Sequence, residues 1–189
     1  IQSITTSINY SQSVYAKDLD GDGDYDVLSA SSHDDRIAWY ENNGTGTFGS
    51  MQTITTQSDE VYSVYAADLD RDGDYDVLSA SFSDDRIAWY ENNGNGSFGS
   101  MQAITTSTDA ASDVYAADLD GDGDLDVLSA SDSNSYWGTD RIAWYENNGI
   151  GTFGSMQTIT TSAGYAYSVY AADLDGDGDY DVLSASYVD

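Results

Sequence analysis

Short stretches in which apolar and polar residues alternate recur along the chain. In RIAWYEN (86–92), Ile87 and Trp89 alternate with Arg, Ala and Tyr, a period of two that is typical of a β-strand. Other stretches of strand-forming residues read VYAAD, VLSAS and FGSMQTITT. No window combines apolar residues at i, i+3, i+4 and i+7 with helix caps. The pattern therefore predicts an all-β protein with almost no helix.

These strands recur in a unit of about 50 residues, of which residues 51–100 are one full copy. The sequence of each full unit predicts four strands, with an Asn-Asn-Gly turn before the last one. Four strands in a unit of about 50 residues are typical of a propeller blade. The third unit carries an insertion within SDSNSYWGTD (131–140), which indicates a loop. We predict a single repeat domain over 1–189, a β-propeller-like array of about four four-stranded blades with the last incomplete. The units cover about 1–50, 51–100, 101–155 and 156–189.

Charge is concentrated in four short strings. The chain has 34 acidic and 5 basic residues, a net charge of −29, while its 40% hydrophobic content argues against a disordered acidic tail. Five basic residues cannot form a patch that neutralises nucleic-acid phosphates, and an anionic membrane surface would repel the chain. No apolar run has the length of a membrane span. We therefore expect neither nucleic-acid binding nor membrane insertion.

The acidic strings read DLDGDGDYD (18–26), DLDRDGDYD (68–76), DLDGDGDLD (118–126) and DLDGDGDYD (173–181). Five carboxylates in one loop repel each other unless a cation lies among them. Aspartates at positions 1, 3 and 5 can converge, glycine at position 6 permits a turn, position 7 offers its carbonyl and position 9 closes the shell. This all-oxygen set suits Ca²⁺. The predicted metal-binding residues are Asp18, Asp20, Asp22, Asp24, Asp26, Asp68, Asp70, Asp72, Asp74, Asp76, Asp118, Asp120, Asp122, Asp124, Asp126, Asp173, Asp175, Asp177, Asp179 and Asp181.

About four Ca²⁺ ions, one per repeat, are thus expected, and other interpretations fit less well. An EF-hand needs a glutamate at position 12, where this chain has serine. A calcium β-helix needs contiguous nonapeptides, and Mg²⁺ prefers fewer carboxylates. A solvated acidic turn without metal would not explain four copies with the same aspartate positions. Leu19 and Tyr25 are predicted to point into the blade, and Arg71, at position 4, to weaken the second site.

The loop D-x-D-x-D-G-x-x-D between two strands, followed later by Phe-Gly, resembles the FG-GAP or VCBS-type repeat, as in the integrin α-subunit β-propeller. The matching Phe-Gly pairs are Phe48-Gly49, Phe98-Gly99 and Phe153-Gly154. The resemblance implies one Ca²⁺ in the hairpin joining the first two strands of each blade. It also implies an extracellular setting and a role in adhesion, ligand binding or surface assembly.

Several residues outside the acidic loops are candidates for other roles. His33 is predicted at the surface, Trp39, Trp89 and Trp144 in the core, and Arg36, Arg86 and Arg141 in pairs with carboxylates. Tyr136 and Trp137, in the inserted loop, are the candidate contact for a sugar or a partner. Sequons at Asn9, Asn43 and Asn95 are possible glycosylation sites. No catalytic constellation is present, so we expect no enzyme.

The fourth unit stops before its RIAWYEN strand, which leaves an open slot. Either the array is longer, or a neighbouring chain donates a strand. The interpretation is an extracellular or cell-surface calcium-binding module with a structural or adhesive role, which binds a protein or carbohydrate at a cell surface or matrix. The alternatives are a fibre subunit joined to other copies by strand donation, and a lectin-like or enzyme-accessory module.

Overall fold

The computed structural model describes residues 3–133 and 138–188, and in these residues the chain is built of β-strands with no helix. The all-β prediction is thus confirmed. Blade 1 comprises β1 (Ser11–Lys17), β2 (Asp26–Ser31), β3 (Arg36–Tyr40) and β4 (Gln52–Thr55), and blade 2 comprises β5 (Val61–Ala67), β6 (Asp76–Ser81), β7 (Arg86–Tyr90) and β8 (Gln102–Thr105). Blade 3 comprises β9 (Ala111–Ala117), β10 (Asp126–Ser131), β11 (Arg141–Tyr145) and β12 (Gln157–Thr160), and blade 4 comprises β13 (Gly164–Ala172) and β14 (Asp181–Val188).

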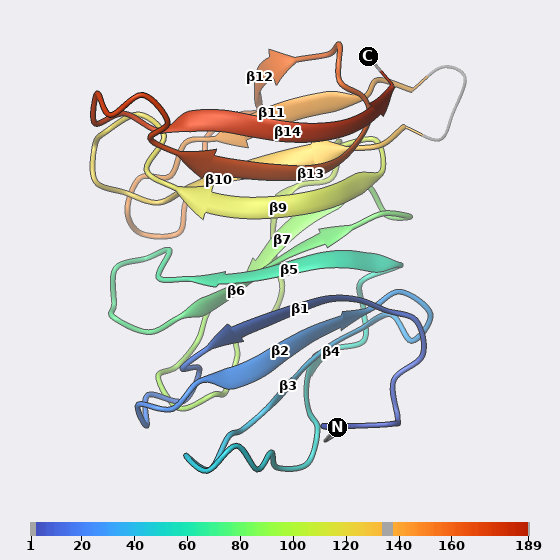
Figure 1. Ribbon diagram of the computed structural model, residues 1–189, viewed down its shortest axis with the longest axis vertical. Helices are drawn as coiled ribbons and strands as arrows, with labels where there is room; N and C mark the ends of the chain where they lie inside the picture. Colours follow the sequence, from blue (N-terminus) through green and yellow to red (C-terminus); the bar gives the residue numbers. More distant parts are fainter. Residues whose placement is uncertain (1–2, 134–137, 189) are drawn as a thin grey trace.

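Each blade is an antiparallel meander, with four strands in blades 1 to 3 and two in blade 4. The blades follow each other in chain order without closing into a ring, from blade 1 at the bottom of Figure 1 through blade 2 to blades 3 and 4 in its upper part. This confirms propeller-like blades with an incomplete last one. The fourth strand is shorter than predicted, because Phe48 forms only an isolated bridge with Asn42 and β4 begins at Gln52.

Middle strands are buried along their whole length because a neighbouring blade covers each face. Every residue of β6 and of β10 is buried, and both read DVLSAS. The small alanine and serine side chains in this segment let the sheets approach closely. Because both of their faces are buried, these strands show a weaker alternation of apolar and polar residues than the strands of a sheet with one face in solvent.

The hydrophobic core lies between the blades and repeats at each junction. Between blades 1 and 2 it joins Leu28, Ile37 and Trp39 to Val64 and Tyr90. The corresponding residues form the junctions between blades 2 and 3 and between blades 3 and 4. Trp39 and Trp89 are buried and Trp144 packs against the last cluster, so the predicted core role of these tryptophans is confirmed.

A row of tyrosines runs across the first strands of all four blades. The rings of Tyr15, Tyr65, Tyr115 and Tyr170 follow each other with centroids 4.6, 4.8 and 4.7 Å apart. Tilted pairs at this separation are favourable for aromatic rings. The row therefore fixes the spacing of consecutive blades along their first strands.

The insertion in blade 3 leaves strand pairing unchanged. Ser131 pairs with Arg141 just as Ser31 pairs with Arg36 in blade 1. The loop between the second and third strands can therefore change length without shifting the register. In the part of the chain that the structure describes, no helix could cross a membrane.

We predict that Gly96→Ala destabilises the protein more than Gly46→Ala. Both glycines have positive φ, 70° and 75°, so both substitutions carry the left-handed penalty of about 1–2 kcal/mol. A Cβ at Gly96 would collide with the Trp39 ring of the preceding blade, whereas one at Gly46 meets nothing within 4 Å. The collision adds about 1–3 kcal/mol, measured as the difference in free energy of unfolding in urea. Equal losses for the two variants would contradict this packing.

Candidate functional site

The four acidic loops, residues 18–26, 68–76, 118–126 and 173–181, all project from the left edge of the stack in Figure 1. In the first loop Asp18 accepts hydrogen bonds from the amides of Gly21 and Gly23, at 2.9 and 3.0 Å. The carboxylate of Asp20 accepts a hydrogen bond from the amide of Asp22, and the carboxylate of Asp22 accepts one from the amide of Asp24. Each carboxylate thus fixes the backbone two to five residues later, and the chain winds around its own side chains.

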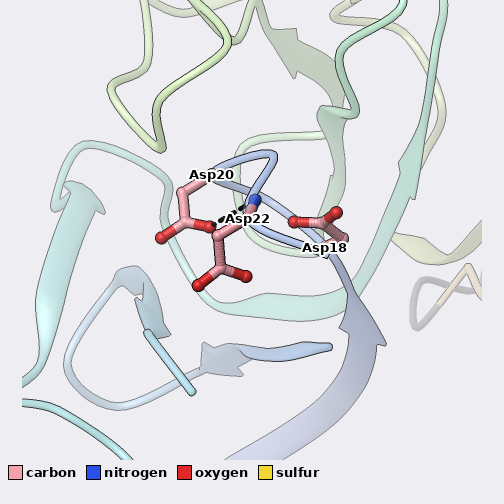
Figure 2. A group of neighbouring side chains, drawn as sticks. All are labelled: Asp18, Asp20 and Asp22. Atoms are coloured by element: carbon pink, nitrogen blue, oxygen red, sulfur yellow. Dashed lines mark hydrogen bonds between the residues drawn. The ribbon is translucent and has the colours of Figure 1, made fainter. Parts of the chain in front are cut away.

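Three carboxylates converge in each loop. They are those of positions 1, 3 and 5 in the first and third loops, as predicted, and those of positions 1, 3 and 9 in the second and fourth loops. Figure 2 shows Asp18, Asp20 and Asp22 facing a common space. In each of the four triads, one oxygen per residue lies within 4.8 Å of the others. Two oxygens bound to one Ca²⁺ at 2.3–2.6 Å are at most about 5 Å apart, so these triads could hold a metal ion. The triads are Asp18, Asp20 and Asp22; Asp68, Asp70 and Asp76; Asp118, Asp120 and Asp122; and Asp173, Asp175 and Asp181.

The aspartate at position 9 connects the loop to the blade. Asp76 is fully buried, and its two carboxylate oxygens accept hydrogen bonds from the amides of Leu69 and Asn92 at 3.0 and 2.8 Å. Burial raises the pKa of Asp76 to about 7, although both hydrogen bonds act to lower it. Burial likewise raises the pKa of Asp126 to about 6. Without a cation, burial therefore favours the protonated, uncharged form of the aspartate at position 9.

The aspartate at position 7 lies elsewhere in the loop. A Cβ at Gly44 would collide with the carboxylate of Asp24, and Gly94 and Asp74 are related in the same way. This side chain therefore packs against the Asn-Asn-Gly turn and is not among the converging oxygens. That its backbone carbonyl binds the ion stays a prediction.

The second loop contains a buried carboxylate oxygen that a cation would satisfy. Asp68 Oδ1 is buried and has no hydrogen-bond partner. In the first loop the equivalent oxygen of Asp18 accepts the amide of Gly21. A buried carboxylate oxygen without a partner is costly, and a divalent ion among Asp68, Asp70 and Asp76 would satisfy it. The residues present fit a hard cation with oxygen ligands.

Arg71 contacts the third loop. Its Nη2 forms an ion pair with Asp124 Oδ1 at 2.5 Å. Its charge is thus directed at the neighbouring blade, and a weakening of its own loop stays a prediction. The contact also links the loops of blades 2 and 3.

The prediction that Leu19 and Tyr25 both point into the blade is correct for Leu19, which is buried, and wrong for Tyr25, which is 63% exposed. The equivalent Tyr75 packs partly against the core between blades 1 and 2. No blade precedes blade 1 in this structure, so Tyr25 has no equivalent cover.

In blades 2 and 3, the first asparagine of the Asn-Asn-Gly turn joins successive loops, a role that the sequence interpretation missed. Asn92 Nδ2 donates to the carbonyl of Leu19 in the preceding blade at 2.8 Å, and to that of Tyr75 in its own blade at 3.0 Å. Asn147 donates in the same way to Leu69 and Leu125. The recurrence of this asparagine in every full unit was the available signal, but it was interpreted only as a turn.

The predicted arginine pairing is found at Arg86, whose Nη1 lies 2.8 Å from Asp84. In all three full units the arginine also contacts a methionine sulfur, for example Arg86 with Met101 at 3.1 Å. His33 is exposed and stacks on Tyr10, in agreement with the prediction of a surface residue. The candidate contact residues Tyr136 and Trp137 lie outside the described residues. The sequon residues Asn9, Asn43 and Asn95 are exposed, and their glycosylation stays a prediction.

A second candidate surface appears when the units are compared with each other. From VYA to SAS, residues 14–31 of the first unit, the four copies differ at only three positions, whereas residues 7–12 and their equivalents in the other units share no common pattern. The loop that follows SAS also differs in every unit. We call the described residues of these two segments the variable edge: 7–12, 32–35, 57–62, 82–85, 107–112, 132–133, 138–140 and 162–167. The variable edge lies opposite the acidic loops, on the right in Figure 1.

The variable edge carries exposed or half-buried aromatic rings and backbone positions with positive φ. Tyr10 stacks on His33 at 5.6 Å between centroids, and Tyr62 on Phe82 at 4.7 Å. Asp35 Oδ1 accepts the amide of Glu60 in the next blade at 3.1 Å, so the edge is continuous across blades. Both Tyr10 and Glu60 have positive φ, a conformation uncommon outside glycine and typical of functional loops.

Comparisons with known proteins agree with this architecture. The chain is similar in structure to an *Agrocybe aegerita* lectin described as recognising non-reducing terminal N-acetylglucosamine, with a TM-score of 0.63, 25% identity, and coverage of 89% of this chain and 45% of the lectin. It is also similar in fold to the *V. cholerae* biofilm matrix protein Bap1, with a TM-score of 0.51, 20% identity, and coverage of 94% and 28%. The chain thus spans less than half of either protein.

Sequence comparison with curated proteins gave no match. The sequence pattern of the FG-GAP-like repeat, in contrast, matches residues 18–79, 70–129 and 118–184, which together cover most of the chain and include all four acidic loops. The chain therefore belongs to the FG-GAP-like repeat family.

Proposed function

We propose that this chain is an extracellular, calcium-stabilised binding module, in which the acidic loops hold structural ions and the variable edge contacts the ligand. The observation that carries the proposal is the set of four converging carboxylate triads, with Asp68 Oδ1 buried and unpartnered in one of them. The proposed role is binding, without catalysis.

Calcium is the ion that best suits these loops. The donors are all oxygens from flexible aspartate side chains, which fit the variable coordination of Ca²⁺ better than the strict octahedron of Mg²⁺. When bound, the ion would neutralise the converging carboxylates. The chain's own residues do the rest: Asp76 holds two backbone amides, and Asn92 ties the loop to the preceding blade. Ion binding therefore contributes to folding.

The ligand class that suits the variable edge is an uncharged carbohydrate. Stacked aromatic rings such as Tyr10 with His33 offer apolar faces for sugar rings, and neighbouring carboxylates such as Asp59 accept hydrogen bonds from hydroxyls. The net charge of −29 disfavours an anionic ligand. The similarity to a lectin at 25% identity supports this choice. A cell-surface or matrix location follows from the need for abundant Ca²⁺ outside cells.

We expect calcium titration to show about four bound ions per chain and to raise the melting temperature. Each site filled to 100 times its Kd adds about 2.7 kcal/mol of stability. Asp70→Asn removes a converging oxygen and is expected to abolish one site, while Asp59→Asn, an exposed aspartate outside the acidic loops, leaves the stoichiometry unchanged. Calorimetry that detects no heat of calcium binding in the wild type would refute the metal assignment.

In the presence of a chelator, stability is expected to fall as pH rises. The pKa of Asp76 is raised from its usual 3.8 to about 7, so the folded state favours the protonated acid. Protonated Asp76 therefore contributes fully to the free energy of unfolding below about pH 4, and this contribution is lost as pH rises through 7. Melting curves across this range should show the fall in the wild type and a smaller one in Asp76→Asn. With saturating calcium the fall should disappear, because the ion binds the ionised form.

Tyr10→Ala should weaken glycan binding, and Tyr25→Ala should not. Both tyrosines are exposed in blade 1, but Tyr10 lies at the variable edge and Tyr25 in an acidic loop. Loss of one stacking ring is expected to weaken binding about tenfold, measured by calorimetry with an uncharged glycan selected on an array. An array on which the calcium-loaded protein binds no uncharged glycan would exclude this ligand class.

A further inference from the structure

We propose that the exposed face of blade 4 packs on the exposed face of blade 1 of a second copy, so that chains associate head to tail. The occupant is a second copy because the chain already forms this interface three times within itself. The inference is independent of the ligand proposed above.

Each internal junction uses the same pair of faces. The preceding blade contributes its second and third strands, such as Leu28 and Trp39, and the following blade contributes its first strand, such as Val64. Leu78 with Val114, and Leu128 with Val169, repeat the arrangement. Blades 1 to 3 therefore each carry one face of each kind, and blade 4 carries the first-strand face and the second-strand part of the other.

In blade 1 the face for a preceding blade is uncovered. Val14 is 70% exposed, whereas the equivalent Val64, Val114 and Val169 are 3%, 2% and 4% exposed. Ala16 is likewise exposed, while the equivalent Ala66 is buried. An apolar surface that is buried at every equivalent position is thus open to solvent at this end.

In blade 4 the complementary face is uncovered. Leu174 is 63% exposed, while the equivalent Leu19 and Leu69 are each 1% exposed. Leu183 is 37% exposed, and its three equivalents are fully buried. One end therefore exposes the first-strand face, and the other exposes the loop and second-strand part of the complementary face. A second copy would bring these two surfaces together.

Polar groups and rings at the two ends match as well. Asn92 donates to the carbonyl of Leu19 in the preceding blade, but Asn42 has only its own-blade acceptor, the carbonyl of Tyr25. In the proposed contact, Asn42 would reach Leu174 of the second copy. The tyrosine row ends at Tyr15 and Tyr170, which would continue it between chains.

Face packing is favoured over donation of a strand to the edge of β14. It reproduces apolar contacts and one recurring polar contact that the chain already makes, whereas a donated strand would leave Val14 uncovered. Packing of the ends places two acidic loops side by side, as at each internal junction, so it requires calcium-loaded loops. Each contact leaves one further end free, so the association extends into a row or closes into a ring of copies, according to the rotation between consecutive chains.

The test is analytical ultracentrifugation of the full chain in saturating calcium over a wide range of concentration. The wild type should show concentration-dependent association. Val14→Asp and Leu174→Asp should each weaken it about tenfold or more. Ile150→Asp is the matched control, since Ile150 is 69% exposed in the Asn-Asn-Gly turn of blade 3, outside both faces. Circular dichroism and calcium titration establish that each variant remains folded and loaded.

Mixing the variants gives the decisive result. Val14→Asp keeps an intact blade 4 face and Leu174→Asp keeps an intact blade 1 face, so an equimolar mixture should form a heterodimer that does not extend. A monomeric wild type at every concentration overturns the proposal and leaves the faces to a different partner. Association that survives both substitutions also overturns it, and indicates strand donation instead. These outcomes do not depend on whether the protein binds glycans.

Discussion

The rest of the structure depends on the hydrogen bonds of the aspartate at position 9 of the acidic loop, which is buried in the first three loops. Asp76 holds the amide of Leu69 at the start of the loop and that of Asn92 at the end of the third strand. Asn92 in turn reaches the carbonyl of Leu19 in the preceding blade. A single carboxylate thus connects the shape of the loop, the pairing of strands and the stacking of blades. Its raised pKa shows that this connection is made at an electrostatic cost.

That cost explains why the charge lies in loops. The strands of a middle blade are covered on both faces, and every residue of β6 is buried, so an unpaired charge within this strand would be costly. The carboxylates are therefore placed where the chain leaves the sheet, at one edge of the stack. A cation bound there would stabilise the junctions between blades as well as the loop itself, because Asn92 and Arg71 link adjacent loops.

The repeated pattern made much of this predictable. Alternation in RIAWYEN identified a strand whose tryptophan is buried, and the spacing of Asp18, Asp20 and Asp22 anticipated their convergence. Contacts between units were not predictable from one unit, because they depend on which residue of the next blade lies opposite. The exposure of Tyr25 and the bond from Asn92 to Leu19 are of this kind. The variable edge was visible in the sequence, but only by comparing units with each other.

The unchanged register around the inserted loop has a consequence for how such a protein diversifies. Ser131 still pairs with Arg141 despite the added residues, so the strand pairing does not depend on what is inserted between them. The half of a blade that carries the acidic loop is thus independent of the length of the loop at its opposite end. New loops can be inserted into a constant frame, one blade at a time, and each insertion leaves the acidic loops and the junctions between blades unchanged.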